Sequence, residues 1–152
     1  MKSLWLIFSF ISCFSYAQQS IEQVLNDFHK AAGEANFTSY FALLANDSIF
    51  LGTDATERWD KASFKAFAKP HFDKGNGWLY QPTHRNITII EANKIAMFDE
   101  LLENEFYGQC RGSGIIVKRE GRWKILQYNL SIPVPNKLSK QVVSIINGSK
   151  NK

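Results

Sequence analysis

The main change in the spacing of apolar residues along this chain occurs at Gly75-Asn76-Gly77. Before this point, apolar residues recur every three or four positions, which is typical of amphipathic helices. After it, long runs rich in apolar and aromatic residues are separated by short turn sequences, which is typical of strands. Helices first and strands afterwards predict an α+β domain in which the helices cover one face of an antiparallel sheet.

The first half is expected to hold three helices and one short strand. The predicted helices cover residues 20–35, residues 36–45 and a stretch from Asp60 onward. Pro70 is expected to end or kink the third helix, because proline has no backbone N–H to donate. The short strand is predicted over residues 48–51.

The second half is expected to hold four long strands and a short terminal helix. The strands are predicted over residues 78–90, 95–103, 109–118 and 122–133, and the helix over residues 138–146. Gly108, Gly112 and Gly114 crowd the third of these strands. Glycines inside a strand usually mark bulges or sharp bends, so we expect the sheet to be strongly bent.

Residues 1–17 have the pattern of a secretory signal peptide. Lys2 precedes an apolar run over residues 4–14, and Ser15 and Ala17 are small residues at a cleavage site. The run is too short to span a membrane, which takes about 20 helical residues. We therefore expect an exported protein, periplasmic or secreted, cleaved near Ala17 and without a membrane span.

A lipoprotein is the alternative, because Ile11-Ser12-Cys13 weakly resembles a bacterial lipobox. Cleavage near Ala17 would leave Cys110 without a partner for an internal disulfide. We expect Cys110 to be a buried small residue, since no histidine or asparagine motif frames it as a nucleophile.

The basic charge of the chain is concentrated in its C-terminal segment. The formal net charge is +4, and residues 137–152 contain four lysines and no acid. Residues 18–136, predicted to be the folded domain, are close to neutral, and residues 137–152 are predicted to be a basic helix or tail. A nucleic-acid partner is not expected for a body without a basic surplus.

The predicted strand over residues 95–103 has two mostly apolar faces. One face must pack against the helices, and an apolar second face on an antiparallel sheet indicates that another subunit or a lid covers it. We therefore expect a homodimer formed through the sheet.

The chain resembles the nuclear transport factor 2-like superfamily, specifically its SnoaL-like branch. FHKAAGEANFTSYFALLANDSIFLGTDATERW resembles the opening helices, the first strand and the loop beyond it, and RGSGIIVKREGRWKILQYNLSIPVPN resembles the closing hairpin. The resemblance covers nearly all of residues 20–136. It implies a cone formed by a strongly bent antiparallel sheet wrapped around N-terminal helices, with a pocket inside. In enzymes of this group the pocket performs acid/base chemistry; the resemblance implies no cofactor.

Asp54 is the candidate catalytic residue. It lies just beyond the first strand, about where isomerase-like members carry a catalytic carboxylate. A base that removes a proton next to a carbonyl needs a pKa raised by apolar surroundings, which Phe50, Trp59 and Tyr80 would provide. The alternative is an Asx turn or a helix cap, as is common for aspartate in such a loop.

Glu57-Arg58-Trp59 and the pair Asp99 and Glu100 are further candidates. Glu57 and Arg58 are expected to form an ion pair that orders the pocket rim, with Trp59 packed beneath. Asp99 and Glu100 are consecutive in a strand, so only one of them can face the pocket.

The inward-facing carboxylate of that pair needs a partner, and Arg111 on the next strand could provide it. Such a pair would be either a substrate clamp or a satisfied pair in the core. Tyr128 and Asn129 also face opposite ways, and either could hydrogen-bond a substrate oxygen; a tyrosine packed in the core is the alternative. The aromatic residue Tyr40 completes the predicted pocket.

No metal site or cofactor site is predicted. His29, His71 and His84 share no ligand spacing, and motifs for phosphate binding or for a serine nucleophile are absent from the sequence.

Three functions are consistent with these features. The leading one is binding of a small apolar or aromatic molecule in an aromatic-lined pocket, without assured catalysis. The second is a cofactor-independent isomerase or cyclase that uses a pocket carboxylate as general base. The third is an interaction module that uses the open face of the sheet.

Overall fold

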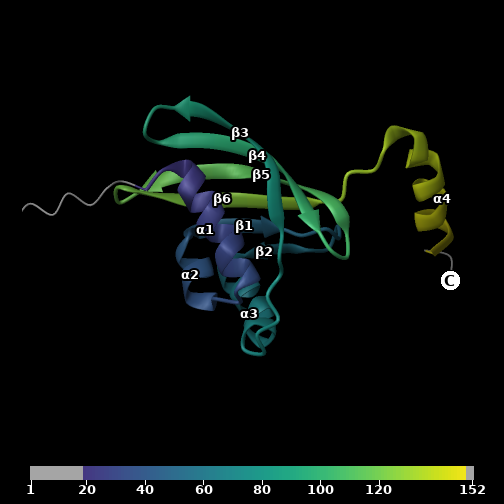
Figure 1. The fold of residues 1–152 in the computed structure, drawn as a ribbon, viewed down its shortest axis with the longest axis horizontal. Coiled ribbons are helices and arrows are strands. Elements are labelled where there is room, and N and C mark those ends of the chain that lie inside the picture. Colours follow the sequence, from purple (N-terminus) through teal and green to yellow (C-terminus); the bar gives the residue numbers. More distant parts are fainter. Residues whose placement is uncertain (1–18, 150–152) are drawn as a thin grey trace, which may run out of the picture.

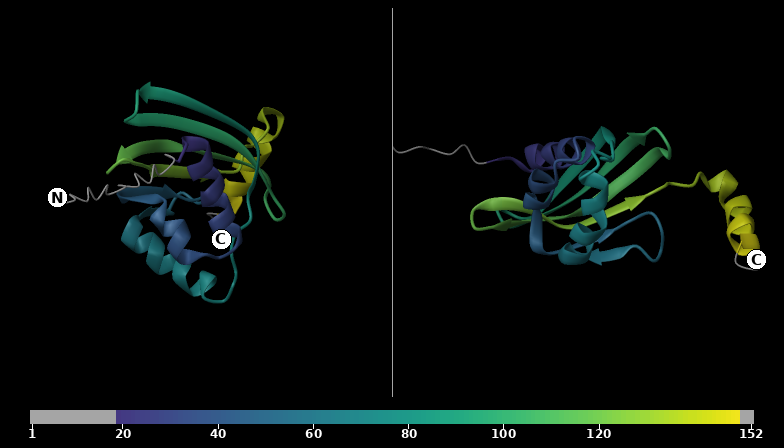
Figure 2. Two further views of the ribbon diagram at one scale, coloured as in Figure 1. Left: turned by 60° about the vertical axis from the view of Figure 1, so that its left-hand side comes forward. Right: turned by 90° about the horizontal axis from the view of Figure 1, so that it is seen from below.

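The computed structural model describes residues 19–149 as four α-helices, one short 3-10 helix and a six-stranded sheet (Figure 1). The predicted signal peptide, its cleavage site and Cys13 lie outside these residues. The α+β class predicted from the sequence is confirmed. The fold is a curled, unclosed sheet with helices packed against its concave side (Figure 2).

Two helices begin at the residues that the sequence indicates. Helix α1 (Ile21–Gly33) is capped by Ser20, whose side chain accepts a hydrogen bond from the backbone N–H of Gln23. Helix α3 (Lys61–Phe72) is capped in the same way by Asp60. Of the two alternatives predicted for Pro70, that it ends α3 was wrong, because the helix continues to Phe72. So near the C-terminal end of the helix, proline removes only a late hydrogen bond.

The second predicted helix is shorter than expected and the first strand is longer. Helix α2 covers Phe37–Ala42, and strand β1 already begins at Leu44 and runs to Leu51. Pairing with β6 causes the difference: the backbone N–H of Ile125 donates to the carbonyl of Leu43 at 2.9 Å. Local sequence favoured helix there, and the neighbouring strand determined the outcome.

The strands form one sheet in the order β2-β1-β6-β5-β4-β3. The remaining strands are β2 (Arg58–Asp60), β3 (Gln81–Glu91), β4 (Ile95–Asn104), β5 (Gly108–Arg119) and β6 (Arg122–Ser131). All neighbours are antiparallel except β1 and β6, which are parallel, so the sheet is mixed. This parallel pair joins the N-terminal half of the chain to the C-terminal hairpin.

Two glycines of β5 lie where there is no room for a side chain. A Cβ on Gly114 would lie 1.9 Å from the carbonyl oxygen of Gln127, and one on Gly112 would lie 2.2 Å from the hydroxyl of Tyr128. The register between β5 and β6 also shifts between Ile115 and Ile116. The glycines therefore allow close approach across a bent sheet.

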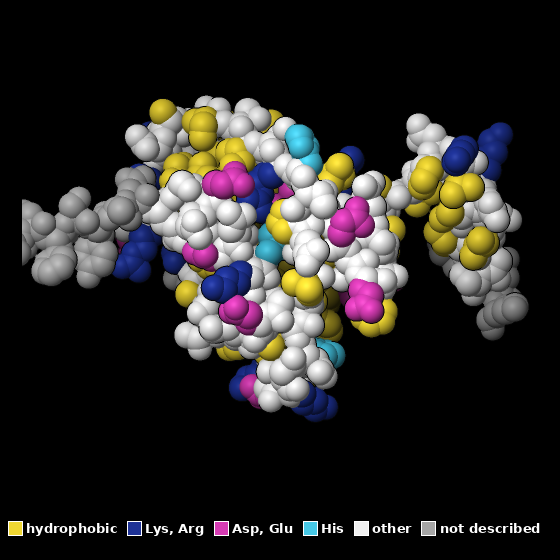
Figure 3. Space-filling model, viewed as in Figure 1, with side chains coloured by type: hydrophobic (Ala, Val, Ile, Leu, Met, Phe, Trp, Pro, Cys, Tyr) yellow, Lys and Arg dark blue, Asp and Glu magenta, His cyan; other side chains and the backbone are white. Residues whose placement is uncertain are grey.

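The C-terminal helix α4 (Ser139–Ser149) follows the 3-10 turn Asn136–Leu138 and stands apart from the domain (Figure 1). None of its residues is buried. Its apolar side chains gather on one exposed surface (Figure 3).

Candidate functional site

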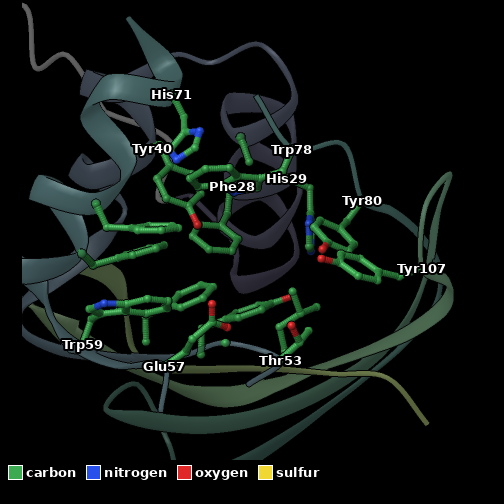
Figure 4. A pocket seen from close by; sticks show the side chains of 17 residues that line it. Phe28, His29, Tyr40, Thr53, Glu57, Trp59, His71, Trp78, Tyr80 and Tyr107 are labelled. Carbon is green, nitrogen blue, oxygen red and sulfur yellow. The ribbon is translucent and has the colours of Figure 1, made fainter. Parts of the chain in front are cut away.

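A cavity of about 240 Å³ lies between the helices and the concave face of the sheet (Figure 4). Most of the side chains that line it are aromatic. They are Phe28, Tyr40, Phe50, Trp59, Phe64, Phe67, Trp78, Tyr80, Tyr107 and Tyr128. His29, His71, Thr53 and Glu57 are the polar side chains of the lining.

One wall of the cavity is formed by α1 and by the segment that follows α3. Helical spacing in α1 and a close contact between the two backbones position it. Phe28 and Ala32 are four residues apart in α1 and therefore share one face. The backbone N–H of Trp78 donates to the carbonyl of Ala32 at 3.1 Å. A Cβ on Gly77 would lie 2.3 Å from the same carbonyl oxygen, so only glycine allows this approach.

Ring stacking holds the wall formed by the sheet and α3. Phe50 of β1 stacks on Phe64 of α3 with their ring centroids 4.0 Å apart, and on Tyr128 of β6 at 5.6 Å. Phe28 stacks on Tyr40 at 4.5 Å on the opposite side. Aromatic pairs at such separations stabilise one another beyond the area they bury.

A buried polar cluster lies behind this wall, centred on Glu100 of β4, which is fully buried. Its Oε1 lies 2.6 Å from His29 Nε2 and accepts a hydrogen bond from the Tyr128 hydroxyl at 3.0 Å. Its Oε2 accepts a hydrogen bond from Arg85 Nε at 2.7 Å. Arg85 Nη1 continues the cluster to Glu22 on the surface of α1.

The hydrogen-bond and charged partners of Glu100 affect its pKa more than its burial does. Burial alone would raise the pKa of this carboxyl, but the hydrogen bond and charge of His29, together with Arg85, hold the pKa below its ordinary value. Burial, reinforced by the neighbouring Glu100 charge, raises the pKa of Tyr128 well above its ordinary value. Glu100 is therefore an ionised acceptor and Tyr128 a neutral donor.

The Nη2 atom of Arg85 makes an ion-pair contact in this cluster but no hydrogen bond. Arg85 Nη2 lies 2.7 Å from Glu100 Oε2, but its direction does not satisfy hydrogen-bond geometry. Because Arg85 Nε already donates to the same oxygen, the guanidinium still compensates the carboxylate charge.

Glu57 places a carboxylate in the cavity lining. It comes from the turn between β1 and β2, and its Oε2 accepts a hydrogen bond from the backbone N–H of Asp54 at 3.1 Å. Its side chain passes over Gly52, where a Cβ would lie 2.2 Å from Oε2. Within residues 19–149, Glu57 forms no ion pair with any Lys, Arg or His, and this includes Arg58, the partner predicted from the sequence.

The predicted ion pair was wrong because β2 turns Arg58 to the other side of the sheet. There it lines a shallow hollow with Asp47 and Ile49, while Trp59 lines the cavity. Consecutive residues of a strand face opposite ways, so Arg58 and Trp59 cannot share a face.

The structure brings together part of the predicted pocket. Tyr40, Trp59, Tyr80 and Tyr128 line the cavity, and Glu100 lies directly behind it. Asp99, Arg111 and Asn129 are not in the lining. Asp99 is exposed and accepts a hydrogen bond from Asn86, and Asn129 faces away from the side on which Tyr128 lies.

Arg111 was the wrong partner for the buried carboxylate. In the sheet register it is opposite Leu101, whose side chain points to the outer face, whereas Arg85 is directly opposite Glu100. The choice between these arginines depends on register, which the sequence does not specify.

Asp54 does not line the cavity. Its Oδ1 accepts hydrogen bonds from the backbone N–H of Thr56 at 2.8 Å and from the Thr56 hydroxyl at 2.6 Å. The Thr56 hydroxyl and the backbone N–H hold the pKa of this exposed carboxyl below its ordinary value. This is the Asx turn that was the alternative interpretation, and it lacks the apolar surroundings that a general base requires.

Sequence reasoning did not assign His29 or Arg85 to the cavity or to the cluster behind it, and it placed Glu57 only at the pocket rim, as a partner of Arg58. His29 carried a signal, because it lies beside Phe28 on the apolar stripe of a predicted helix. A polar residue on such a stripe needs a buried partner. Arg85 carried no comparable signal.

Residues 19–149 contain no group of three or more His, Cys, Asp or Glu side chains that could hold a metal ion. In the same part of the chain no helix has the length and apolar character needed to cross a membrane.

The family model of the SnoaL-like domain matches residues 21–135. The chain therefore belongs to the SnoaL-like domain family. No curated protein matches the chain by sequence.

Solved structures share the fold at low sequence identity. A nuclear transport factor 2-like protein of unknown function from Pseudomonas putida is 13% identical, with a TM-score of 0.64 over 77% of this chain and 87% of that chain. A protein from Novosphingobium aromaticivorans, provisionally described as a scytalone dehydratase, is 13% identical, with a TM-score of 0.63 over 75% and 82%. One from Shewanella frigidimarina, provisionally described as a ketosteroid isomerase, is 20% identical, with a TM-score of 0.55 over 71% and 91%.

Proposed function

We propose that this domain binds a small, largely apolar, ring-containing molecule in the aromatic cavity. The observation that carries this proposal is the cavity itself, with ten aromatic residues in its lining. Ligand pockets are typically apolar concavities with a few polar groups that orient the ligand. Here Thr53, Glu57 and the two histidines provide those groups.

The size of the cavity limits the ligand. A protein cavity of roughly 150 Å³ is large enough for benzene, so about 240 Å³ suits a molecule of one or two rings. A larger ligand would need the mouth, where Thr53 and Tyr107 are exposed, to contribute contacts.

A variant that obstructs the mouth of the cavity tests this proposal. Thr53→Trp would place a large ring at the cavity entrance, whereas Ala55→Trp adds the same ring to the same loop outside the lining. We expect one- and two-ring probes to raise the melting temperature of the wild type and the Ala55→Trp variant but not of Thr53→Trp. Equal responses of the three proteins would contradict binding in this cavity.

An isomerase or cyclase is the second candidate, and the position of Glu57 favours it. Its carboxylate lines the cavity, which a general base must do. Two fold relatives carry provisional enzyme descriptions, a dehydratase and an isomerase. Conversion of a β,γ-unsaturated cyclic ketone to its conjugated isomer, lost in Glu57→Gln, would support this candidate; no turnover above the buffer rate would contradict it.

We also propose a homodimer formed through the outer face of the sheet. Ile49, Leu51, Ile115 and Leu126 lie around one shallow hollow on that face, and Met97 is 48% exposed on it. Sedimentation velocity tests this arrangement: we expect a dimer that Leu126→Lys converts to monomers, and a monomeric wild type would overturn it.

Export is a further part of the proposed function, supported by the pattern of residues 1–17. Mass spectrometry of the protein from its source is expected to show an N-terminus at Gln18. Retention of Met1 would contradict export, and a lipid on Cys13 would support the lipoprotein alternative.

A further inference from the structure

We infer that the ligand of the aromatic cavity is an organic cation, bound by the Glu57 carboxylate and the surrounding ring faces. This inference rests on the proposed function, because it specifies the ligand class of the same cavity. Three features of the described residues carry it: the charges of the lining, the position of Glu57 and the arrangement of the rings.

The lining contains one carboxylate and neither lysine nor arginine. Two basic side chains of the domain, Lys61 and Arg85, bind other groups. Lys61 donates to the carbonyl of Leu44, and Arg85 pairs with Glu100 and Glu22. Among residues 19–149, no Lys, Arg or His forms an ion pair with Glu57, and its neighbour Arg58 lines the hollow on the other face of the sheet.

The two histidines of the lining do not supply this missing charge. His29 directs Nε2 to Glu100, so any proton it carries is balanced by that carboxylate at 2.6 Å. His71 is exposed at the edge of the cavity, beyond Tyr40 in Figure 4. An anionic ligand would thus meet the Glu57 charge without a dedicated cation to bind it.

Glu57 is held in place before any ligand arrives. The backbone N–H of Asp54 binds Oε2, and Gly52 leaves the space that the side chain crosses. No described residue donates a hydrogen bond to Oε1. A preorganised carboxylate with a free oxygen can accept a charge-assisted hydrogen bond or a close ammonium contact from a ligand.

Aromatic side chains lie across the cavity from Glu57. In Figure 4 the carboxylate lies on one side, beside Trp59, and Phe28, Tyr40 and Trp78 lie on the other. Ring faces carry negative potential and attract cations, with Trp the strongest. A neutral ligand would cover Glu57 without pairing it, which costs free energy, whereas a cation gains from both the rings and the carboxylate.

Three probes of similar size test the inference by titration calorimetry: benzyltrimethylammonium, its uncharged isostere neopentylbenzene, and the anion tert-butylbenzoate. We expect the wild type to bind the cation at least about tenfold more tightly than the neutral isostere, which corresponds to roughly 1.4 kcal/mol. Glu57→Gln should remove most of this preference, because it weakens binding of the cation and removes the cost that neopentylbenzene pays for covering an unpaired carboxylate.

Asp54→Asn is the matched control. It removes a negative charge from the same loop, outside the lining, and asparagine can still accept the two hydrogen bonds of the Asx turn. We expect this variant to keep the cation preference, because a screened charge outside the cavity contributes little. Loss of the preference in both variants would overturn the role of Glu57.

The remaining outcomes separate this inference from the proposed function. If neopentylbenzene or the anion binds at least as tightly as the cation, the inference is overturned while the cavity remains a ligand site. If none of the three probes binds the wild type and Thr53→Trp behaves identically, both the inference and the proposed function fail.

Discussion

Two glutamates near the cavity have opposite environments. Glu100 is completely buried and bound by His29, Arg85 and Tyr128, whereas Glu57 is half-buried with one backbone hydrogen bond. All three partners of Glu100 come from elements other than its own. A carboxylate enclosed by its partners stabilises the fold, and one with a free oxygen toward a cavity is available to a ligand. Burial by itself therefore does not identify a functional acid.

The largest expected effect is the removal of the buried carboxylate. Glu100→Ala would leave Arg85 and any charge on His29 uncompensated in the interior, so we expect a loss of about 3–5 kcal/mol in the free energy of unfolding. Urea denaturation measures it, with Asp99→Ala as control, because Asp99 is the exposed neighbour on the same strand. Equal effects of the two variants would show that the cluster does not support the fold.

Gly112→Ala should disturb the same cluster without removing any of its members. The new Cβ would lie 2.2 Å from the Tyr128 hydroxyl and 2.9 Å from Glu100 Oε1, so the side chains must shift. We expect a loss of about 1–3 kcal/mol. Gly148→Ala, which meets nothing within 4 Å, should not destabilise the protein; a similar cost for both would argue against the steric explanation.

Tyr128→Phe should have a smaller effect, because it removes one of the hydrogen bonds to Glu100 and keeps the ring. We expect a loss of about 1 kcal/mol in unfolding free energy. Tyr107→Phe, at a residue that is 51% exposed, is the control and should be neutral. A neutral Tyr128→Phe would indicate that His29 and Arg85 satisfy the carboxylate on their own.

The stabilisation by ionised Glu100 should be lost only in acid. Its pKa in the folded protein lies below the ordinary value of 4.5, so the contribution is present above that value and disappears as the pH falls through the folded pKa. Carbon-13 NMR of the Glu100 carboxyl is expected to show a midpoint below 4.5. A midpoint above this value would mean that burial outweighs the partners.

The smallest expected effect on stability is that of Glu57→Gln. Because Glu57 forms no ion pair within residues 19–149 and glutamine can still accept from Asp54 N–H, we expect a change within about 0.5 kcal/mol. Thermal and urea unfolding measure it. A loss comparable to that of Glu100→Ala would remove the contrast between the two glutamates and make Glu57 a structural residue.

Local signals predicted where α1 and α3 begin, but not where α2 ends or that β2 forms. Ser20 and Asp60 mark the starts of α1 and α3 in the sequence, and both prove to be capping residues. The end of α2 was predicted three residues late, because pairing with β6 converts Leu44 and Ala45 to strand. Propensity describes a segment alone, and contacts with distant segments can override it.

In the candidate site, too, the sequence predicted the kinds of residue present, and the tertiary structure determined which of them face the cavity. The aromatic character of the cavity follows from residues singled out in the sequence, including Tyr40, Trp59, Tyr80 and Tyr128. The carboxylate of the lining was expected at Asp54 and is found at Glu57, three residues further in the same loop. Loop conformation, which depends on a few hydrogen bonds and on Gly52, determined which acid faces inward.

The sequence by itself determined the α+β class, the order of the helices and of every strand except β2, the bend in the sheet and the supply of aromatic side chains. These properties depend on periodicity, caps and glycines, which act within a few residues of the chain. Only the tertiary structure decided that Arg85 pairs with Glu100, that His29 joins them, and that Glu57 lines the cavity. Strand register and helix docking set these contacts, and a shift of one residue in a strand would turn each of its side chains to the opposite face.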